Sequence, residues 1–360
     1  MPEQEPIFKV LDETGMLPFV SIIMPIRNEA RYISDCLKSI LNQDYPPHLL
    51  EVLVVDGMSN DETREIVRGF IHSEEEGEKR NQASSVDTTG GKPAIVLLDN
   101  PGRIVPSAFN IGLQHAKGEI IIRVDGHCRI DHDYVRRCVE LLRTKGADNV
   151  GGLMRGEGQS FAARVISLAT SSPFGVGGAR FHYAQTAGWV DTVYLGAYRR
   201  EVFARIGGFD EELVRNQDDE FNFRLTQSGG KIWLDPSIQV TYYVRSNFRT
   251  LWRQYFQYGF YKVRVIQKRR QVASWRHMVP ASFVAALAFT IILSLISGHK
   301  FWGFLVAGPY LAANILASIW TARRDWETIR LLPLAFFILH FAYGSGFLWG
   351  LWRWRHKWKL

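Results

Sequence analysis

The C-terminal part of the chain contains three long apolar runs, and they constrain the fold more than any other feature. Residues 279–298, 301–320 and 331–350 include no aspartate, glutamate, lysine or arginine. A helix of about 20 apolar residues is long enough to cross the roughly 30 Å hydrocarbon layer of a membrane. A buried helical core in a soluble domain is the alternative, but three uncharged runs in succession favour a membrane region. We therefore predict that residues 273–360 contain transmembrane helices.

Basic segments beside these runs predict the orientation. Arginine and lysine are frequent in 267–277, before the first run, and in 321–330, after the second. Such segments tend to stay on the cytoplasmic side, so the first two runs should form a hairpin. The third run would carry the basic tail 353–360 to the opposite side. Residues 331–350 therefore either span against the charge rule or are re-entrant, and both alternatives stay open. We expect a multi-pass protein of the inner (cytoplasmic) membrane with its soluble part in the cytosol.

The segment before the membrane region mixes aromatic and basic residues. Together with the net charge of +7, this composition predicts that 246–272 is an amphipathic helix on anionic lipid headgroups. A nucleic-acid surface is the alternative, but the neighbouring apolar run favours membrane lipids, so we expect no nucleic-acid partner. The cysteines Cys36, Cys128 and Cys138 are odd in number and have no Cys-x-x-Cys spacing, which indicates reduced thiols and a cytosolic location.

The first two thirds of the chain alternate between apolar strands and amphipathic helices. Strands are predicted at 20–26, 49–56, 94–98 and 119–124, and helices at 30–41, 59–70, 105–116 and 131–142. Strands that are apolar throughout indicate a parallel sheet covered on both faces. We therefore predict an α/β domain over 19–245, Rossmann-like, with a mostly parallel sheet and helices on both faces. An N-terminal tail over 1–18 and an exposed, mobile loop over 72–92 complete this part.

Three of the predicted strands are followed by an aspartate: Asp56, Asp99 and Asp125. In parallel sheets, ligands bind beyond the carboxyl ends of the strands. A single aspartate there is a common turn residue, and Asp99 could simply end its strand. Three aspartates together predict a polar binding site along one edge of the sheet.

Five motifs carry a resemblance to a known family. They read VSIIMPIRNE, VLVVDGMSNDET, FNIGLQHAKGEIIIRVDGH, GGFDE and NQDDEFNFRL. Their order and spacing resemble family 2 glycosyltransferases over about residues 19–265, with the bacterial succinoglycan or exopolysaccharide type as the most similar branch. These are inverting enzymes of the GT-A fold that use nucleotide-diphospho-sugars. The resemblance therefore implies a GT-A catalytic domain followed by a helical membrane region.

By this resemblance, Asp125-Gly126-His127 takes the place of the family's Asp-x-Asp metal motif. Asp125 and His127 are then expected to bind a divalent cation, Mn²⁺ or Mg²⁺, that neutralises the leaving diphosphate. Histidine in place of the usual second acid weakly favours Mn²⁺. Gly126 would let the backbone approach the ligand. An ordinary turn after the strand is the alternative.

The resemblance also implies which residues contact the nucleotide donor. The expected donor-binding residues are Pro25, Asn28, Glu29, Asp56, Arg103, Asn110 and Asp125. Pro25, Asn28 and Glu29 would line the nucleoside pocket, and Asp56 would accept a hydrogen bond from the base. Arg103 could pair with a phosphate, or it could be an ordinary surface charge.

The motif NQDDEFNFRL, aligned on Arg224, places Asp218 at the family's catalytic acid position. Gln217 stands where the family has glutamate, which is a departure. An acid at a helix N-terminus is held ionised by the helix dipole, which suits a general base. Asp218 and Asp219 could instead be simple N-terminal capping acids.

The prediction is a membrane-bound hexosyltransferase. It would transfer one sugar, with inversion, from a nucleotide-diphospho-sugar such as a UDP-hexose to a lipid-linked saccharide in exopolysaccharide or cell-surface glycan synthesis. Processive synthases carry a Gln-x-x-Arg-Trp string that this sequence lacks, which favours single addition. A processive synthase, a polyprenyl-phosphate glycosyltransferase and a non-catalytic membrane scaffold with the same fold remain alternatives.

Overall fold

The computed structural model describes residues 16–72, 92–244, 247–271 and 275–358. They form two compact units, which are described separately below. The first unit comprises the described parts of 1–154, 184–212 and 217–242. The second comprises those of 155–183, 213–216 and 243–360. The expected mobile loop 72–92 and tail 1–18 lie almost entirely outside the described residues.

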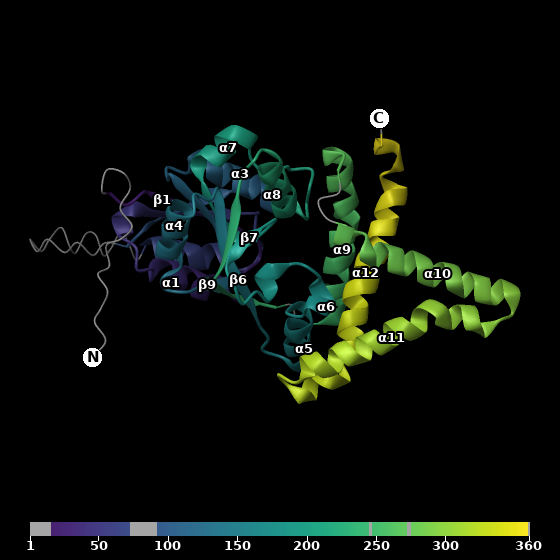
Figure 1. Cartoon of the computed structure of the whole chain (residues 1–360). Coiled ribbons are helices and arrows are strands. Elements are labelled where there is room, and N and C mark those ends of the chain that lie inside the picture. The colour runs from purple at the N-terminus through teal and green to yellow at the C-terminus, as the bar shows by residue number, and fades with distance from the viewer. Residues whose placement is uncertain (1–15, 73–91, 245–246, 272–274, 359–360) are drawn as a thin grey trace, which may run out of the picture. The chain divides into compact units, whose positions relative to one another are not determined.

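The first unit is built on one mixed β-sheet (Figure 1). The strand order is β3-β2-β1-β4-β8-β6-β9-β5, and β7 pairs with β9. Strands β1 to β4 pair in parallel, whereas β8 runs antiparallel to β4 and β6, and β5 and β7 run antiparallel to β9. The predicted α/β fold is confirmed, with the correction that only half of the sheet is parallel. The strands are β1 (Val20–Ile26), β2 (Leu50–Asp56), β3 (Ala94–Asp99), β4 (Ile120–Arg123), β5 (Cys128–Ile130), β6 (Asn149–Glu157), β7 (Gly188–Val190), β8 (Tyr194–Arg199) and β9 (Ile232–Tyr243).

Successive residues of a strand point to opposite faces of the sheet, so an apolar strand exposes apolar side chains on both faces. Helices cover both faces here. On one face, Ile22 and Met24 of β1 share a buried cluster with residues of α1 and α4. On the other face, α3 packs so closely that a Cβ at Gly112 would lie 2.5 Å from Ile23 Cγ2. The helices of this unit are α1 (Ile33–Leu41), a helix over 63–72, α3 (Val105–His115), α4 (Tyr134–Thr144), α7 (Arg200–Ile206) and α8 (Gln217–Gln227).

The second unit is helical. Its α-helices are α5 (Phe161–Thr170), α6 (Pro173–Val176), α9 (Phe248–Arg269), α10 (Val279–Ser297), α11 (Lys300–Ala322) and α12 (Leu332–Arg353). Three helical segments, Trp275–Ser297, Lys300–Ala322 and Leu332–Arg353, are long and apolar enough to cross a membrane. This agrees with the three runs predicted from the sequence. The third run forms one continuous helix. In its most apolar 18-residue stretch 50% of the residues are buried, whereas the corresponding shares for the first two helices are 17% and 11%.

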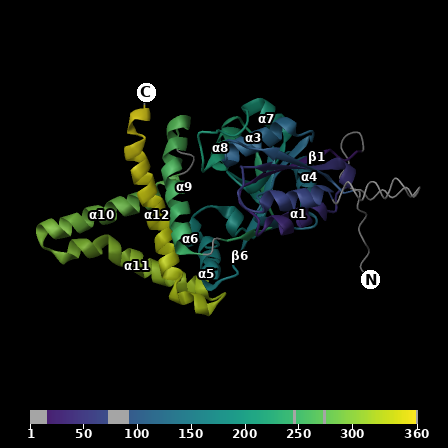
Figure 2. The ribbon, with the colours of Figure 1, turned by 180° about the vertical axis from the view of Figure 1, so that it is seen from behind.

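Burial of α12 is explained by its parallel packing along α9. Figures 1 and 2 show the two helices side by side. The contacts advance along both helices in the same direction. The Trp252 ring packs against the Phe341 ring, and further along both helices Gln267 Nε2 donates to the Trp354 carbonyl. A Cβ added at Gly346 would lie 2.1 Å from the Phe256 carbonyl oxygen. Glycine is therefore required where the two backbones touch.

This close approach predicts opposite effects at two glycines. Alanine normally stabilises a helix by up to about 1 kcal/mol relative to glycine. At Gly346 the new methyl group must displace the α9 backbone, so we expect Gly346→Ala to destabilise the protein by about 1–3 kcal/mol. At Gly308 of α11 a Cβ meets nothing within 4 Å, so Gly308→Ala should be neutral or stabilising. Thermal unfolding in detergent would compare the two variants, and equal effects would contradict close helix contact.

Candidate functional site

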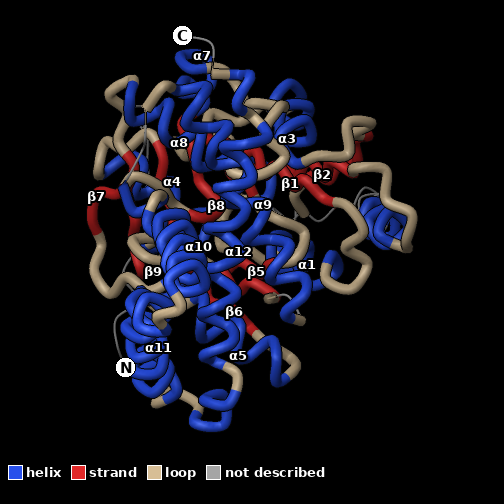
Figure 3. The backbone as a smooth tube through the Cα atoms, turned by 90° about the vertical axis from the view of Figure 1, so that its right-hand side faces the viewer, coloured by secondary structure: helices blue, strands red, loops and turns tan. Residues whose placement is uncertain are grey.

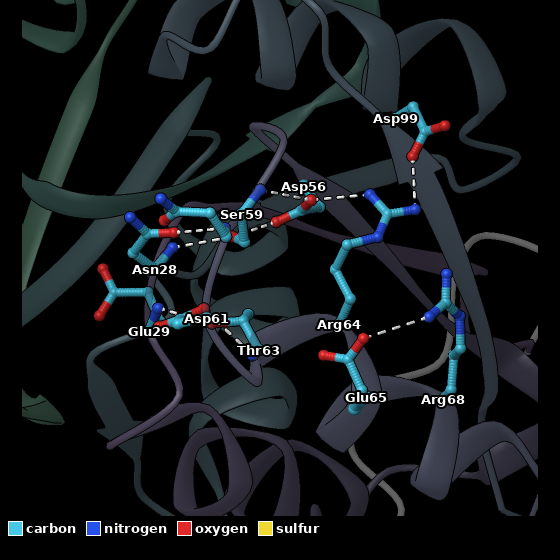
Figure 4. A network of polar contacts seen from close by, with 11 residues as sticks. Asn28, Glu29, Asp56, Ser59, Asp61, Thr63, Arg64, Glu65, Arg68 and Asp99 are labelled. Carbon is cyan, nitrogen blue, oxygen red and sulfur yellow. Dashed lines mark hydrogen bonds and ion pairs between the residues drawn. The ribbon is translucent and has the colours of Figure 1, made fainter.

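The carboxyl ends of β2 and β3 carry two acids joined by one arginine. Asp56 and Asp99 are register partners on the adjacent strands. Arg64 donates from Nη1 to Asp56 Oδ2 and from Nη2 to Asp99 Oδ1, each at 2.7 Å (Figure 4). Hydrogen bonds to Asp56 and then to Asp99 raise the pKa of Arg64. The predicted alignment of acids at this edge is therefore present, and Arg64 was not foreseen.

Loops after β1 and β2 are tied together beside these acids (Figure 4). The Asn28 N–H donates to Ser59 Oγ at 2.8 Å, and Asn28 Oδ1 accepts from the Asn60 N–H at 3.0 Å. Asn28 has a φ of 55°, a left-handed conformation that asparagine tolerates better than most residues. Ser59 also donates to Asp56. The expected nucleoside-pocket residue Asn28 thus lies at this edge, while Pro25 is buried within β1.

The helix that follows starts four residues later than predicted. Its first residue is Thr63 rather than Ser59, because Asp61 Oδ1 accepts from the Thr63 N–H at 3.1 Å and Ser59 is engaged by Asp56. Burial alone would raise the pKa of Asp61, but hydrogen bonds from Thr63 and Ala30 outweigh it and lower the pKa. Thr63 also accepts from the Glu29 N–H at 2.8 Å, which fixes the backbone of Glu29.

A second cluster lies at the end of β4, where Arg123 contacts two carboxylates. Its Nε and Nη2 donate to Asp125 Oδ1 at 2.9 and 2.8 Å, and its Nη1 lies 3.8 Å from Asp218 Oδ2. The side chain of Arg123 is only 9% exposed. Burial would lower the pKa of Arg123, but the charges of Asp125 and Asp218 outweigh it and raise the pKa above its usual value. Arg123 therefore joins the predicted metal ligand to the predicted base.

Asp125 is held as a carboxylate. Its Oδ2 accepts from the Tyr194 hydroxyl at 3.3 Å, in addition to the two bonds from Arg123. Burial would raise the pKa of Asp125, but the charge of Arg123, together with hydrogen bonds from Arg123 and Tyr194, lowers it below the ordinary range. The thiols of Cys36 and Cys128 both donate to the Asp125 backbone carbonyl, at 3.4 and 2.9 Å. All three cysteines are free and buried.

His127 is oriented by Glu29. His127 Nδ1 lies 2.9 Å from Glu29 Oε1. A carboxylate only accepts hydrogen bonds, so this contact places the proton on Nδ1 and leaves the Nε2 lone pair available. A Cβ at Gly126 would lie 2.8 Å from Ile26 Cγ2 and 3.1 Å from Glu29 Cγ. The glycine between the two predicted ligands is therefore required by packing against the β1 loop.

Asp125 and His127 are the two residues predicted to bind a metal ion. Among the described residues, no group of three histidine, cysteine, aspartate or glutamate side chains could hold a metal ion. Asp125 offers a carboxylate and His127 an imidazole oriented by a second carboxylate, the arrangement that metal-ligating histidines usually have. Two protein ligands suit a cation that takes its other ligands from phosphate oxygens and water. The residues present fit a metal that binds together with a diphosphate.

Asp218 begins α8, where its Oδ1 accepts from the Asp219 N–H at 2.9 Å. Its side chain is 40% exposed, so solvent and a substrate can reach it. Gln217, the departure from the family pattern, is buried, and its Oε1 has no hydrogen-bond partner within the described residues. An unsatisfied buried oxygen costs about 1–3 kcal/mol. The start of α8 thus combines an accessible carboxylate with a buried acceptor that lacks a donor.

Two motif residues support the loop of the GGFDE motif. Arg224 pairs with the buried Glu220, with Nε at 2.8 Å from Oε1, and its Nη2 donates to the Gly208 carbonyl at 2.6 Å. Asn110 on α3 donates to the Phe209 carbonyl and accepts from the Phe209 N–H, at 2.9 and 2.8 Å. The predicted donor residue Asn110 is thus engaged in holding this loop. Arg103 lies exposed before α3 with a φ of 57°.

Comparisons with known proteins identify the class. Residues 21–207 match the family model described as Glycosyl transferase family 2. The chain is 30% identical over 330 residues to the succinoglycan biosynthesis protein ExoA of Rhizobium meliloti (strain 1021), covering 91% of this chain and 93% of that protein. It is 28% identical over 340 residues to a Methanococcus voltae protein named dolichyl N-acetyl-alpha-D-glucosaminyl phosphate 3-beta-D-2,3-diacetamido-2,3-dideoxy-beta-D-glucuronosyltransferase, covering 92% and 97%.

A solved structure shares the fold. The mannosyltransferase PcManGT from Pyrobaculum calidifontis, in complex with GDP-Man and Mn²⁺, aligns with a TM-score of 0.58 at 20% identity and covers 93% of this chain and 88% of that one. The mixed sheet and this likeness show that the chain has a GT-A-like fold. The chain belongs to glycosyl transferase family 2.

Proposed function

We propose that this glycosyltransferase transfers one sugar, with inversion, from a UDP-hexose to a lipid-linked saccharide in exopolysaccharide or cell-surface glycan synthesis. The observation that carries the proposal is the contact of Arg123 with both Asp125 and Asp218. It puts a buried carboxylate suited to the donor side beside an accessible carboxylate suited to the acceptor side. The names of the two relatives, one for succinoglycan and one with a dolichyl-linked acceptor, support the substrate class.

In this proposal the acceptor hydroxyl lies at Asp218. The carboxylate takes the proton of the hydroxyl as its oxygen attacks the sugar carbon, opposite the departing diphosphate. Arg123 stays between the two acids and fixes both carboxylates. Attack from the face opposite the leaving group accounts for inversion.

The donor lies along the edge formed by the strand ends. We assign the donor side of the site to Pro25, Asn28, Glu29, Asp56, Arg103, Asn110 and Asp125. Arg64 and Ser59 fix the Asp56 carboxylate, and Asn110 acts by holding the Phe209 backbone. Asp125 and the Nε2 atom of His127 would hold a divalent cation, and such a cation, when bound, neutralises charge on the leaving diphosphate.

The function is tested with a panel of nucleotide-sugars. The full-length protein would be incubated with each donor and with membrane lipid extract, and the lipid products would be weighed by mass spectrometry. We expect a mass increase of one hexose with UDP-linked donors. A ladder of products would show a processive synthase instead, and absence of nucleotide-sugar turnover would exclude the enzyme assignment.

The metal is tested by removal. EDTA should abolish transfer, and Mn²⁺ should restore it more fully than Mg²⁺ because His127 supplies a nitrogen ligand. His127→Asp should shift the preference toward Mg²⁺, since magnesium favours oxygen ligands. Isothermal titration of UDP with and without Mn²⁺ gives a readout that does not depend on turnover. Full activity in EDTA would exclude the metal assignment.

We further propose that only the α10–α11 hairpin crosses the membrane. Figures 1 and 2 show this hairpin projecting crosswise from the α9–α12 pair. If α12 crossed the hydrocarbon layer, α9 beside it would carry its cations across too, at about 2.5–3.5 kcal/mol for each central arginine or lysine. The cations of α9 are Arg249, Arg253, Lys262, Arg264, Lys268 and Arg269. Placing α9 and α12 together at the membrane surface avoids this cost.

This topology also removes the conflict with the charge rule, because the basic tail after α12 stays in the cytosol. We expect a cysteine at His356 to react with a membrane-impermeant maleimide from the cytosolic side. A cysteine at His299, in the hairpin turn, should react from the opposite side. The natural cysteines are buried, which keeps the background low. Labelling of both positions from one side would contradict the proposal.

A further inference from the structure

The second unit contains a small hollow where α11 ends. Its volume is about 200 Å³, and it is lined by Ser171, Ser172, Trp320, Thr321, Arg323 and Arg324. The two serines join α5 to α6, and the other four residues form the end of α11 and the start of the following link. Pockets for whole small molecules usually measure about 300–1,000 Å³. This hollow therefore suits a single compact group rather than a nucleotide.

The lining offers hydrogen-bond donors of the kind that bind phosphate. Ser172 and Thr321 are buried, and Thr321 Oγ1 donates to Ser172 Oγ at 3.5 Å, so the Ser172 hydroxyl is the one of the two that can donate to a ligand. Arg323 and Arg324 add two guanidinium groups, whose planar sets of N–H donors match phosphate oxygens. Hydroxyls and guanidinium groups on one hollow form a donor-rich site for a phosphate or a diphosphate.

The positive charge of the hollow is not cancelled by its neighbours. The nearest acids along the chain, Asp325 and Glu327, pair with Arg164 of α5, at 3.2 and 2.8 Å. Within the part of the chain that the structure describes, neither Arg323 nor Arg324 is paired with a carboxylate. Both arginines are exposed and remain free to bind an anion.

If α11 crosses the membrane as proposed, the hollow at its end lies at the level of the membrane surface. It adjoins the last turn of a 23-residue apolar helix, and Trp320 is 55% exposed, as is typical of tryptophans at the lipid–water boundary. Arginines that only mark the cytoplasmic end of a span need no hollow and no buried hydroxyls. A compact anion at this depth belongs to a molecule anchored in the lipid.

We propose that this hollow binds the phosphate or diphosphate group of the lipid-linked acceptor, an inference that rests on the proposed function. The lipid chain would lie in the membrane beside α11, and the saccharide would extend from the phosphate away from the lipid. The site would then select acceptors by their charged link, independently of the sugar that is attached.

Binding to the full-length protein in nanodiscs tests the proposal. Phosphatidylcholine discs would carry either long-chain polyprenyl diphosphate or an equal charge of phosphatidylglycerol, and inorganic pyrophosphate would be titrated separately. Arg323→Gln/Arg324→Gln should weaken polyprenyl diphosphate binding at least about 10-fold, the effect of losing a charge-assisted hydrogen bond. The control Arg249→Gln/Arg330→Gln removes the same charge from exposed arginines outside the hollow and should change binding less than about twofold.

Each outcome decides the proposal. Equal losses of polyprenyl diphosphate affinity in the two double variants, or equal affinity for phosphatidylglycerol, would show that the hollow attracts anionic lipids in general. Either result would overturn the proposal. Inorganic pyrophosphate that binds as tightly as the lipid would overturn the lipid assignment. Hydrolysis of the nucleotide-sugar without acceptor should be unchanged in Arg323→Gln/Arg324→Gln. Wild-type protein that binds the lipid but turns over no donor would instead refute the proposed function, so the two failures are separable.

Discussion

Replacement of Asp218 by asparagine should lower sugar transfer by about 10²–10⁴-fold, the usual contribution of a positioned general base. Asparagine keeps the shape of the side chain and still accepts the Asp219 N–H, so α8 should keep its start. The amide cannot take a proton from the acceptor hydroxyl. We expect nucleotide affinity to stay nearly unchanged, because in the proposed function the donor binds at Asp125 and not at Asp218.

Asp219 is the matched control for this experiment. It follows Asp218 by one residue, about 100° around the helix, and should not face the same hydroxyl. Calorimetry of UDP binding and turnover of the lipid acceptor would be measured on the same preparations. An inactive Asp219→Asn variant together with an active Asp218→Asn variant would show that the alignment on Arg224 is wrong by one residue. Full activity in both would place the base elsewhere.

Replacement of Asp125 by asparagine should abolish transfer and also destabilise the fold. Asp125 supplies the carboxylate for the donor side and the closest counter-charge of Arg123, whose side chain is 9% exposed. Removing one partner of a buried ion pair costs about 3–5 kcal/mol. We expect the lower end of this range, because Asp218 still faces Arg123 at 3.8 Å. Chemical denaturation of the variant and the parent would measure the difference.

A second substitution separates stability from catalysis. Arg123→Met removes the buried cation, so Arg123→Met combined with Asp125→Asn should recover part of the lost stability and none of the transfer. If the double variant loses the sum of the two single losses, the two side chains do not depend on each other.

The same pair gives a pH dependence with a defined sign. The folded pKa of Asp125 is lowered from its ordinary value of 3.8, so the ionised carboxylate stabilises the protein above that pH. This stabilisation is lost as the pH falls through the lower folded pKa. The difference in stability between the parent and Asp125→Asn should therefore shrink below about pH 4. A difference that is constant down to pH 2 would contradict an ionised Asp125.

The parallel half of the sheet could be predicted because its strands are mostly apolar. Residues 20–26 and 50–56 are buried along their whole length, so most positions are apolar, and two buried exceptions, Ser21 and Glu51, hydrogen-bond to each other. The antiparallel half gave no such pattern. Strand β9 contains Asp235, Pro236 and Ser237, and β5 and β7 each have only three residues. These strands are specified by pairing with distant segments, which local composition does not reveal.

The sequence predicted the acids of the candidate site but not its arginines. Asp56 and Asp125 follow strands, so the rule for parallel sheets placed them at one edge. Arg64 lies in a helix that begins only at Thr63, and Arg123 is the last residue of a buried strand. An arginine within an apolar strand could have been recognised as needing a buried acid. Which acid it contacts, Asp218 across the fold, depends on tertiary structure.

Because Arg123 contacts both Asp125 and Asp218, the proposed donor and acceptor sides should be thermodynamically coupled. A donor that binds at Asp125 changes how strongly the Arg123 guanidinium interacts with Asp218. An acceptor that binds at Asp218 likewise changes how strongly Arg123 interacts with Asp125. Linkage requires these two effects to be equal in free energy. Donor and acceptor should therefore bind cooperatively, with either substrate altering the affinity for the other by the same factor.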